Sequence, residues 1–290
     1  MRYRLLAYLE LTKPRIALMV LVTAALGYYL GVVFTGEFPG WLSFVFAMLG
    51  TAMAGGGASA LNQYLERDID ARMERTRKRP LPTGAVTPQS ALYFGVALAL
   101  GGCFLLLFES NLLTAFLTLQ STFLYVLVYT PMKRLTWLNT SVGAIPGAMP
   151  PLIGWAAATG TLHAGAWILF AVLYIWQHPH FFAIAWMYRD DFERGGLKML
   201  PVVKPDGKIM FVQVMSFSLI LIPVSMLLTV IGLSGWIYTV GALFLGLAML
   251  AGSAAFTLQQ THASAKRVFR ISLIYLPMLL LLILIDATLL

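Results

Sequence analysis

Long apolar stretches dominate the chain, and charged residues are confined to the segments between them. A spanning helix needs about 20 mostly apolar residues, because about 30 Å of hydrocarbon is crossed at about 1.5 Å per residue. Two uncharged stretches, 135–188 and 209–265, are long enough for two helices each. The five other expected spans are 16–36, 38–65, 90–108, 110–132 and 271–290. The pattern therefore predicts an all-α membrane helical bundle of nine transmembrane helices, which forms a single domain over residues 1–290.

Lysine and arginine fall on only one side of the predicted bundle. With nine spans, alternate connections share a side, and all 20 Lys and Arg residues lie in 1–15, 66–89, 133–137, 189–208 and 257–270. Cytoplasmic connections of membrane proteins are enriched in these residues. We therefore expect a multi-pass protein of the bacterial inner membrane, with a cytoplasmic N-terminus and a periplasmic C-terminus. The first segment is too short and too charged to be a cleavable signal peptide.

Composition supports this interpretation and excludes several other classes. Of the 290 residues, 59% are hydrophobic and 11% are charged, whereas roughly 25% are charged in soluble domains. An ordinary soluble protein and a disordered chain are therefore excluded. The single cysteine, Cys103, excludes an intrachain disulfide and a cysteine zinc site. The net charge of +8 arises mostly from the one-sided connections, so we expect no nucleic-acid partner.

The first large cytoplasmic connection carries a candidate metal site. Asn62, Glu66 and Asp70 are four residues apart, and on a helix this spacing places them on one face. Stacked carboxylates repel one another unless a cation lies between them. Their hard oxygen atoms suit Mg²⁺, which proteins hold with a few carboxylates and substrate phosphates. The alternative is a solvated loop with internal salt bridges, to which Asp68 and Glu74 would belong.

A second acidic segment, 188–194, follows the sixth predicted span and also combines carboxylates with arginines. Two such clusters could hold two metal ions against one diphosphate. Lys133 and Arg134, at the end of the fourth predicted span, could bind the same phosphate oxygens. The basic residues of the first connection could instead contact anionic lipids.

Further motifs accompany the two acidic segments. They are 11–15 (LTKPR), 79–84 (RPLPTG), 129–134 (YTPMKR), 147–155 (GAMPPLIGW), 176–181 (WQHPHF) and 199–201 (MLP). Together with Asn62-x-x-x-Glu66-x-x-x-Asp70, this set resembles the UbiA superfamily of intramembrane prenyltransferases, and within it the branch that farnesylates protohaem IX. Two departures stand out. Many superfamily members have Asp at the position of Glu66, and many have two aspartates four apart where only Asp191 matches here.

The resemblance implies that a farnesyl group passes from farnesyl diphosphate to a vinyl group of protohaem IX, with addition of water. The products would be diphosphate and haem O, which serves terminal oxidases. Magnesium is the implied cofactor, and the residues implied to hold it are Asn62, Glu66, Asp70 and Asp191. The residues implied to neutralise the diphosphate are Lys133, Arg134 and Arg75. An aromatic-lined dry cavity would stabilise the allylic cation. The implied partners are the lipid bilayer and proteins of haem delivery or oxidase assembly.

Two histidines, His178 and His180, lie inside the sixth predicted span on either side of Pro179, which is expected to kink the helix. A lone buried histidine more often bonds a backbone carbonyl than a metal, but a polar pair inside a membrane favours function. Given the resemblance, we expect at least one of them to contact haem, at the iron or at a propionate. His163 and His262 are expected at the surface.

Two other functions are compatible with the pattern. The first is a prenyltransferase of the same fold that acts on a quinone precursor or chlorophyllide, and the histidine pair argues against it. The second is a multi-span transporter. Transporters tend to have paired repeats and charges near the membrane midplane, whereas the charges here lie at one face. A structural subunit of an oxidase would give no reason for stacked carboxylates.

Overall fold

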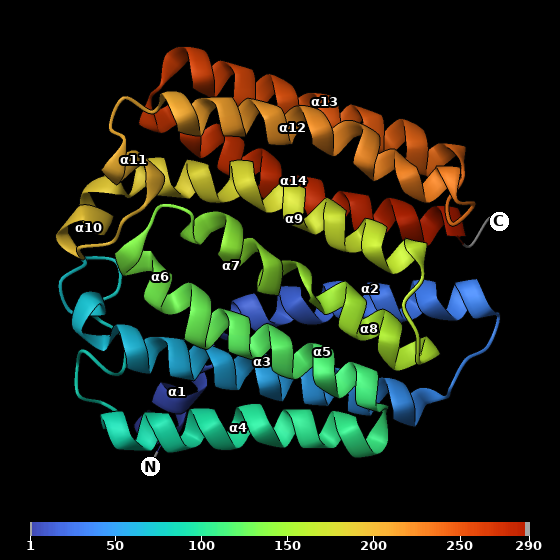
Figure 1. The fold of residues 1–290 in the computed structure, drawn as a ribbon, viewed down its shortest axis with the longest axis horizontal. Coiled ribbons are helices and arrows are strands. Elements are labelled where there is room, and N and C mark those ends of the chain that lie inside the picture. Colours follow the sequence, from blue (N-terminus) through green and yellow to red (C-terminus); the bar gives the residue numbers. More distant parts are fainter. Residues whose placement is uncertain (1, 288–290) are drawn as a thin grey trace. The chain divides into compact units, whose positions relative to one another are not determined.

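The structure, a computed structural model, describes residues 2–287, and every regular element in that range is helical. The elements are α1 (Arg2–Leu11), α2 (Pro14–Thr35), α3 (Trp41–Asp70), α4 (Pro88–Glu109), α5 (Leu112–Phe123), the π-helix η1 (Leu124–Tyr129), α6 (Thr130–Leu135), α7 (Asn139–Ala148), α8 (Pro150–Thr159), α9 (Ala164–Met187), α10 (Arg189–Arg194), α11 (Leu200–Val203), α12 (Lys208–Val230), α13 (Trp236–Gln259) and α14 (His262–Ala287) (Figure 1). The predicted periplasmic C-terminus lies outside the described residues.

The helices form two compact units. Unit 1 comprises Met1–Leu162 together with Asp190–Lys198, and unit 2 comprises His163–Arg189 together with Met199–Leu290. Unit 1 therefore contains α1 to α8 and nearly all of α10. Unit 2 contains α9 and α11 to α14. The first acidic segment and the carboxylates of the second, at 190–194, belong to unit 1, and the histidine pair belongs to unit 2.

Eight helices of the described chain are long and apolar enough to cross a membrane, which confirms the predicted all-α bundle. The fifth predicted span is instead divided into two consecutive helices, α7 and α8, which meet at Met149. Pro150 and Pro151 follow at once, and a proline lacks the N–H that would continue the preceding helix. Residues 139–159 together are still about as long as one crossing, at about 1.5 Å per residue.

One predicted connection is almost entirely helical. The sequence pattern placed a cytoplasmic loop at 257–270, but α13 ends at Gln259 and α14 begins at His262. The basic residues of this segment, Lys266, Arg267 and Arg270, therefore lie on the first turns of α14. A run of charges does not end a helix, so charge alone placed this boundary too late.

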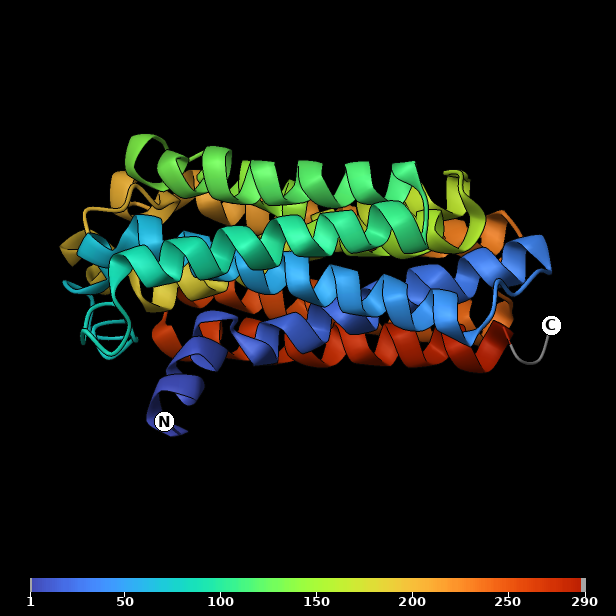
Figure 2. The same cartoon turned by 90° about the horizontal axis from the view of Figure 1, so that it is seen from below.

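Unit 1 is held together by close helix pairs. α3 runs alongside α4 in both views (Figures 1 and 2), and Gly57 of α3 faces the backbone of Gly95 and Ala99 so closely that a Cβ atom would clash. Gly154 of α8 meets the backbone of Ala24 in α2 in the same way. Small residues allow such close approach between helices in a membrane, so Gly57 and Gly154 serve helix packing in unit 1.

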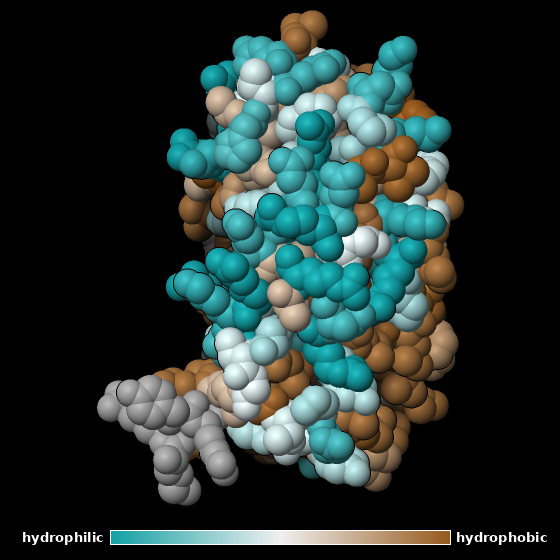
Figure 3. Space-filling view, turned by 90° about the vertical axis from the view of Figure 1, so that its left-hand side faces the viewer, coloured by the Kyte–Doolittle hydropathy of each residue, from teal (hydrophilic) through white to brown (hydrophobic). Residues whose placement is uncertain are grey.

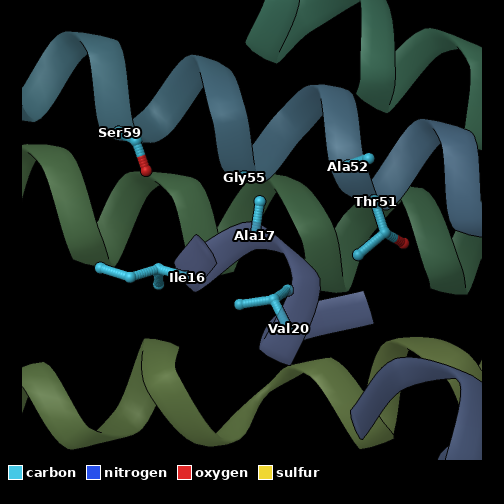
Figure 4. Close-up of a pocket in the computed structure, with 7 residues that line it drawn as sticks. All are labelled: Ile16, Ala17, Val20, Thr51, Ala52, Gly55 and Ser59. Carbon is cyan, nitrogen blue, oxygen red and sulfur yellow. The ribbon is translucent and has the colours of Figure 1, made fainter. Parts of the chain in front are cut away.

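Between α2 and α3 lies a small cavity of about 30 Å³. The residues that line this cavity are Ile16, Ala17, Val20, Thr51, Ala52, Gly55 and Ser59 (Figure 4). Its wall is mostly apolar, and its volume suits a water molecule rather than an isoprenoid or a porphyrin. This cavity is therefore not a substrate site.

Unit 2 is a four-helix arrangement in which α9 packs against α12 and α14, and α13 packs against both of these. α9 is the most buried of the candidate spans. In its most apolar stretch of 18 residues, 61% of the residues are buried, against 28–44% in the corresponding stretches of the other spans. Pro179 does not end α9, which continues to Met187. The helix that carries the histidine pair is thus the one most enclosed by protein.

Candidate active site

At one end of unit 1, α3, α6 and α10 end or begin (Figure 1), and these helices and the loop after α3 carry a layer of paired charged side chains there. Hydrophilic side chains gather at this end of the molecule, and apolar side chains cover its flanks (Figure 3). α3 has 30 residues, about 45 Å at about 1.5 Å per residue, so it is longer than the hydrocarbon layer. Its last turns can therefore carry polar groups beyond the apolar part of the membrane.

The three predicted oxygen donors of α3 are buried in this layer. Asn62, Glu66 and Asp70 are only 1%, 5% and 1% exposed. The side chain of Asp68, in contrast, is 47% exposed, and that of Glu74 is 69% exposed. The structure thus separates the carboxylates as the helical spacing predicts, with one buried face and one solvated face.

Each buried donor has its own basic partner. Lys13 donates a hydrogen bond from Nζ to Asn62 Oδ1 at 2.9 Å. Lys133 Nζ lies 2.8 Å from Glu66 Oε1. In the third pair a single nitrogen, Arg79 Nη1, is shared between both carboxylate oxygens of Asp70, at 2.9 Å from Oδ1 and 2.8 Å from Oδ2. Buried carboxylates are stable only when such partners offset their lost hydration.

Lys13 is a site residue that sequence reasoning did not single out. It joins α1 to α2 in a left-handed conformation, with φ of 51°, and Pro14 begins the next helix. Burial, together with the charges of Arg79 and Lys133, lowers the pKa of Lys13 to about 7. The available signal was a lysine directly before a helix-starting proline, at the same polar end as the acidic motif.

Lys133 is positioned by the π-helix η1. Thr130, the first residue of α6, donates its hydroxyl to the carbonyl of Tyr125 at 2.8 Å, five residues back. Asn62 Nδ2 donates in turn to Thr130 Oγ1 at 3.0 Å. Lys133 Nζ lies 4.6 Å from the ring centroid of Tyr129, which is within range of a cation–π contact. Short π segments often occur at functional sites, and this one fixes the turn that carries Lys133.

Asp191 holds the loop that follows α3. Its carboxylate accepts hydrogen bonds from the backbone N–H of Glu74 at 2.8 Å and of Arg75 at 3.3 Å. Arg194 Nη2 lies 2.8 Å from Asp191 Oδ1. Burial alone would raise the pKa of Asp191, but these hydrogen bonds outweigh it and hold the pKa below its usual value. The carboxylate is therefore already engaged with the chain itself.

Two of the predicted diphosphate ligands are exposed and contact other side chains of unit 1. Arg134 forms a bidentate pair with Asp68 at 2.7 and 3.0 Å, and its side chain is 43% exposed. Arg75 is exposed, with its guanidinium 5.7 Å from the ring centroid of Phe192. Arg79, the first residue of the 79–84 motif, is the arginine that reaches Asp70.

The donor chemistry fits a magnesium ion at the α3 cluster better than at Asp191. Across the described residues, no group of three His, Cys, Asp or Glu side chains is arranged to hold a metal. Asn62, Glu66 and Asp70 nevertheless offer hard oxygen atoms on one buried face, and substrate phosphates supply the remaining ligands of a typical Mg²⁺ site. Three basic groups face two carboxylates here, and Lys13, whose pKa is lowered to about 7, would be protonated more fully next to a bound anion.

In unit 2 the two histidines contact different helices. The ring of His178 stacks on Phe217 of α12, with centroids 3.7 Å apart, and its Nδ1 lies 2.8 Å from the carbonyl oxygen of Tyr174. The ring of His180 faces α14, where Nδ1 lies 2.7 Å from Ser272 Oγ. Residues two apart on a helix point about 200° apart, so the pair does not form one bidentate unit. His163 and His262 are exposed, as predicted.

Comparison with known proteins points to one family. The sequence profile of the UbiA prenyltransferase family matches residues 19–276. A protoheme IX farnesyltransferase of Solibacter usitatus is 44% identical, with 96% of this chain and 98% of that protein covered. A protein of the same name from Salinibacter ruber is 46% identical, again with 96% and 98% covered.

Solved structures give the same fold. A study of digeranylgeranylglyceryl phosphate synthase in membranes provides a structure with a TM-score of 0.84 at 18% identity, and both chains are covered completely. A UbiA homologue from Archaeoglobus fulgidus, bound to DMAPP and Mg²⁺, gives a TM-score of 0.66 at 15% identity, with 96% of this chain and 99% of that chain covered. At such low identity these likenesses concern the fold.

Proposed function

We propose that this chain, which belongs to the UbiA prenyltransferase family, is a Mg²⁺-dependent membrane prenyltransferase. It transfers a farnesyl group from farnesyl diphosphate to a vinyl group of protohaem IX. Water adds in the same reaction, and the products are haem O and diphosphate. The observation that carries this proposal is the near-complete match to two relatives of that name at 44% and 46% identity. The buried cluster of α3 supplies chemistry that such a reaction requires.

Unit 1 carries the residues that would bind Mg²⁺ and the diphosphate of the prenyl donor. Asn62, Glu66 and Asp70 would hold Mg²⁺ jointly with phosphate oxygens, and the ion would neutralise charge that develops on the leaving diphosphate. Lys133 and Lys13 are the buried ammonium groups next to these donors. They are placed to bind the phosphate oxygens that the ion leaves uncovered.

Three further residues support this site at its rim. Asp191 orders the backbone of Glu74 and Arg75 by its hydrogen bonds, so we assign it to loop positioning rather than to a second metal ion. Arg75 and Arg134 are exposed basic groups at the same end of unit 1. They attract the anionic substrate and contact its diphosphate once it is bound.

The acceptor half of the reaction depends on the histidine pair. We assign a haem contact to at least one of His178 and His180, both buried in the most enclosed helix of unit 2. Aromatic rings surround them, and a dry aromatic environment favours an allylic cation over its capture by water. The electron-rich vinyl carbon of haem attacks that cation, and water then adds to the resulting haem-side cation.

In the cell this chemistry belongs at the cytoplasmic face of the bacterial inner membrane. All Lys and Arg residues lie on the side of the chain that the charge rule assigns to the cytoplasm, and the α3 cluster lies among them. The N-terminus would then be cytoplasmic and the C-terminus periplasmic. Both substrates are lipophilic, so the bilayer itself is a partner, along with proteins that deliver haem or assemble terminal oxidases.

The test is the haem O content of membranes that contain the full-length chain, supplied with haem, farnesyl diphosphate and Mg²⁺ and analysed by mass spectrometry. Asp70→Ala should lower haem O formation by on the order of 100-fold, as removal of a key electrostatic group does. Glu74→Ala is the matched control, because it keeps the backbone N–H that Asp191 accepts and removes only an exposed carboxylate, which lies 3.9 Å from Arg194 Nη2. Its activity should stay within about threefold of the wild type.

Three outcomes would contradict the proposal in different ways. Well-folded wild type that modifies no haem would exclude haem as the acceptor. Diphosphate release with 4-hydroxybenzoate under the same conditions would then indicate a quinone-precursor prenyltransferase. Absence of diphosphate release with every acceptor would leave transport as the function to test.

A further inference from the structure

The contacts of His180 determine which of its ring nitrogens carries the proton. Ser272 donates its hydroxyl hydrogen to the carbonyl oxygen of Phe269 at 2.7 Å, and a carbonyl oxygen can only accept. A hydroxyl has one hydrogen, so Ser272 Oγ has only lone pairs left for His180 Nδ1, which lies 2.7 Å away. The hydrogen of that second bond must therefore come from Nδ1. In the neutral ring, Nε2 then carries a lone pair.

The same contacts prevent the ring from turning over. Trp176 stacks on His180 with centroids 5.0 Å apart and planes 23° apart, and Phe269 lies 5.1 Å away. Trp176 Nε1 donates to the backbone carbonyl of Ser272 at 3.1 Å, so one residue of α14 fixes both rings of α9. Ser272 is fully buried, and bulk water does not compete for its hydroxyl.

We propose that Ser272 is a positioning residue that holds His180 with Nε2 unprotonated, so that His180 ligates the haem iron through Nε2. A neutral imidazole nitrogen with a lone pair is the form that binds iron. It is also a poor partner for a haem propionate, because the carboxylate and the unprotonated Nε2 are both acceptors. Metal-bound histidines usually donate their other N–H to an outer partner that sets orientation and basicity, and Ser272 Oγ provides that acceptor.

This inference rests on the proposed haem substrate, and it adds that His180 Nε2 is the atom that binds the haem iron. The ligation must be reversible, because the modified haem leaves the enzyme. Neutral hydroxyl oxygen is a weaker hydrogen-bond acceptor than carboxylate, and it therefore makes the histidine a less basic ligand than a carboxylate partner would. Ser272 thus suits an enzyme that binds haem through iron and then releases it.

The experiment uses the full-length protein in detergent with ferrous haem and without farnesyl diphosphate, so that no chemistry occurs. Resonance Raman spectroscopy reports the iron–histidine stretch, and a haem titration gives the dissociation constant. We expect an iron–histidine band in the wild type, its loss in His180→Gly, and its return when imidazole is added to that variant. Ser272→Ala should shift the band and weaken haem binding by on the order of tenfold, the lower end of outer-partner effects.

Controls separate positioning from folding. Ser272→Thr keeps the hydroxyl and should restore the wild-type band, and Ser272→Cys, of similar volume but with a weak acceptor, should resemble Ser272→Ala. Ser218→Ala removes another fully buried serine of unit 2, whose partner is Ser253 at 2.8 Å. It should leave the band unchanged.

The results that overturn the inference differ from those that overturn the proposed function. An iron–histidine band that survives in His180→Gly excludes His180 as the ligand. A wild type that binds haem without such a band, yet forms haem O, excludes iron ligation and leaves the reaction intact. A wild-type band in Ser272→Ala excludes the positioning role of Ser272. If the wild type neither binds haem nor forms haem O, the proposed substrate itself is wrong.

Discussion

Lys133 Nζ lies 2.8 Å from Glu66 Oε1, and both side chains are largely buried, at 14% and 7% exposure. This ion pair links α6 to α3 at the polar end of unit 1. The same lysine faces the ring of Tyr129, so it is held from two sides. A buried cation that already neutralises a carboxylate proposed to bind Mg²⁺ is positioned to change partners when a diphosphate and its metal ion bind.

Removing one member of this pair should harm both stability and activity. Lys133→Met leaves Glu66 as an unpaired buried charge, and loss of one partner of a buried pair typically costs about 3–5 kcal/mol. The double variant Lys133→Met with Glu66→Gln removes both charges and should regain most of the stability. It should remain inactive, because the proposed diphosphate ligand and the proposed metal ligand are both lost.

Thermal unfolding in detergent and haem O formation measure the two effects separately. A double variant that regains activity together with stability would show that the pair is only structural. A single variant as stable as the wild type would show that Glu66 finds another partner in unit 1.

Lys13 should make stability depend on pH. Its pKa is lowered from 10.5 to about 7 in the folded protein, so between these values the unfolded chain holds one proton more than the folded chain. Stability then rises with pH, by up to about 1.4 kcal/mol per pH unit for one proton. Lys13→Met should remove this contribution.

The comparison to make is the unfolding midpoint of wild type and Lys13→Met from pH 7 to pH 9. We expect the difference between them to change steadily over this range. Lys198→Met, which removes an exposed lysine of the same unit, should follow the wild type throughout. Parallel curves for wild type and Lys13→Met would mean that folding does not lower the pKa of Lys13.

Asp191 should control the order of the loop after α3. Asp191→Ala removes the acceptor of the Glu74 and Arg75 N–H groups, and hydrogen bonds to a charged group contribute about 1.5–3 kcal/mol. Amide exchange at these two positions should therefore accelerate by on the order of tenfold to a hundredfold, since about 1.4 kcal/mol corresponds to a factor of ten.

Hydrogen–deuterium exchange with mass spectrometry resolves this loop as a peptide. Asp191→Asn keeps an acceptor oxygen and should give a smaller effect, whereas Asp190→Ala, next to it and exposed, should have little effect. Equal exchange in Asp191→Ala and wild type would contradict the loop-positioning role and would favour Asp191 as a ligand of a second metal ion.

The candidate site was predictable where it depends on helical spacing and not where it depends on distant contacts. Asn62, Glu66 and Asp70 lie on one buried face because four-residue spacing repeats every turn. Lys13 is 49 residues from its partner Asn62 along the chain, and no local sequence pattern predicts a contact over that separation. Adjacent residues are also hard to assign from the sequence. Lys133 and Arg134 looked equivalent, but neighbours on a helix point about 100° apart, so Lys133 pairs with Glu66 and Arg134 with Asp68.

The fold, too, was predictable where it depends on the length of apolar stretches and not where it depends on contacts within a span. Apolar length predicted the long helices well, because hydrocarbon thickness sets a minimum that the chain must meet. It could not predict the break at Met149 or the π-helix before Thr130, since both depend on prolines and hydrogen bonds within one span. The histidine pair likewise looked like one unit in the sequence, yet His178 and His180 face α12 and α14 respectively.

Asp286 should stabilise unit 2 without affecting catalysis. This buried residue of α14 accepts hydrogen bonds from the backbone N–H of Gly235, directly before α13, and of Tyr238 in its first turn, the latter at 3.4 Å. A carboxylate at a helix N-terminus satisfies unpaired N–H groups and faces the positive end of the helix dipole. Asp286→Ala should therefore lower stability by about 1–2 kcal/mol, as loss of an N-terminal cap does.

The readout is again the unfolding midpoint, with haem O formation measured well below that temperature. Asp286→Asn keeps one acceptor oxygen and should lose less stability than the alanine variant, while Asp206→Ala, which removes an exposed acceptor 3.4 Å from the backbone N of Lys208, should lose the least. Activity per folded molecule should be unchanged in all three, because the cap stabilises α13 without supplying a group to either substrate. A variant that folds normally but loses activity would place Asp286 in the reaction and refute its assignment as a cap.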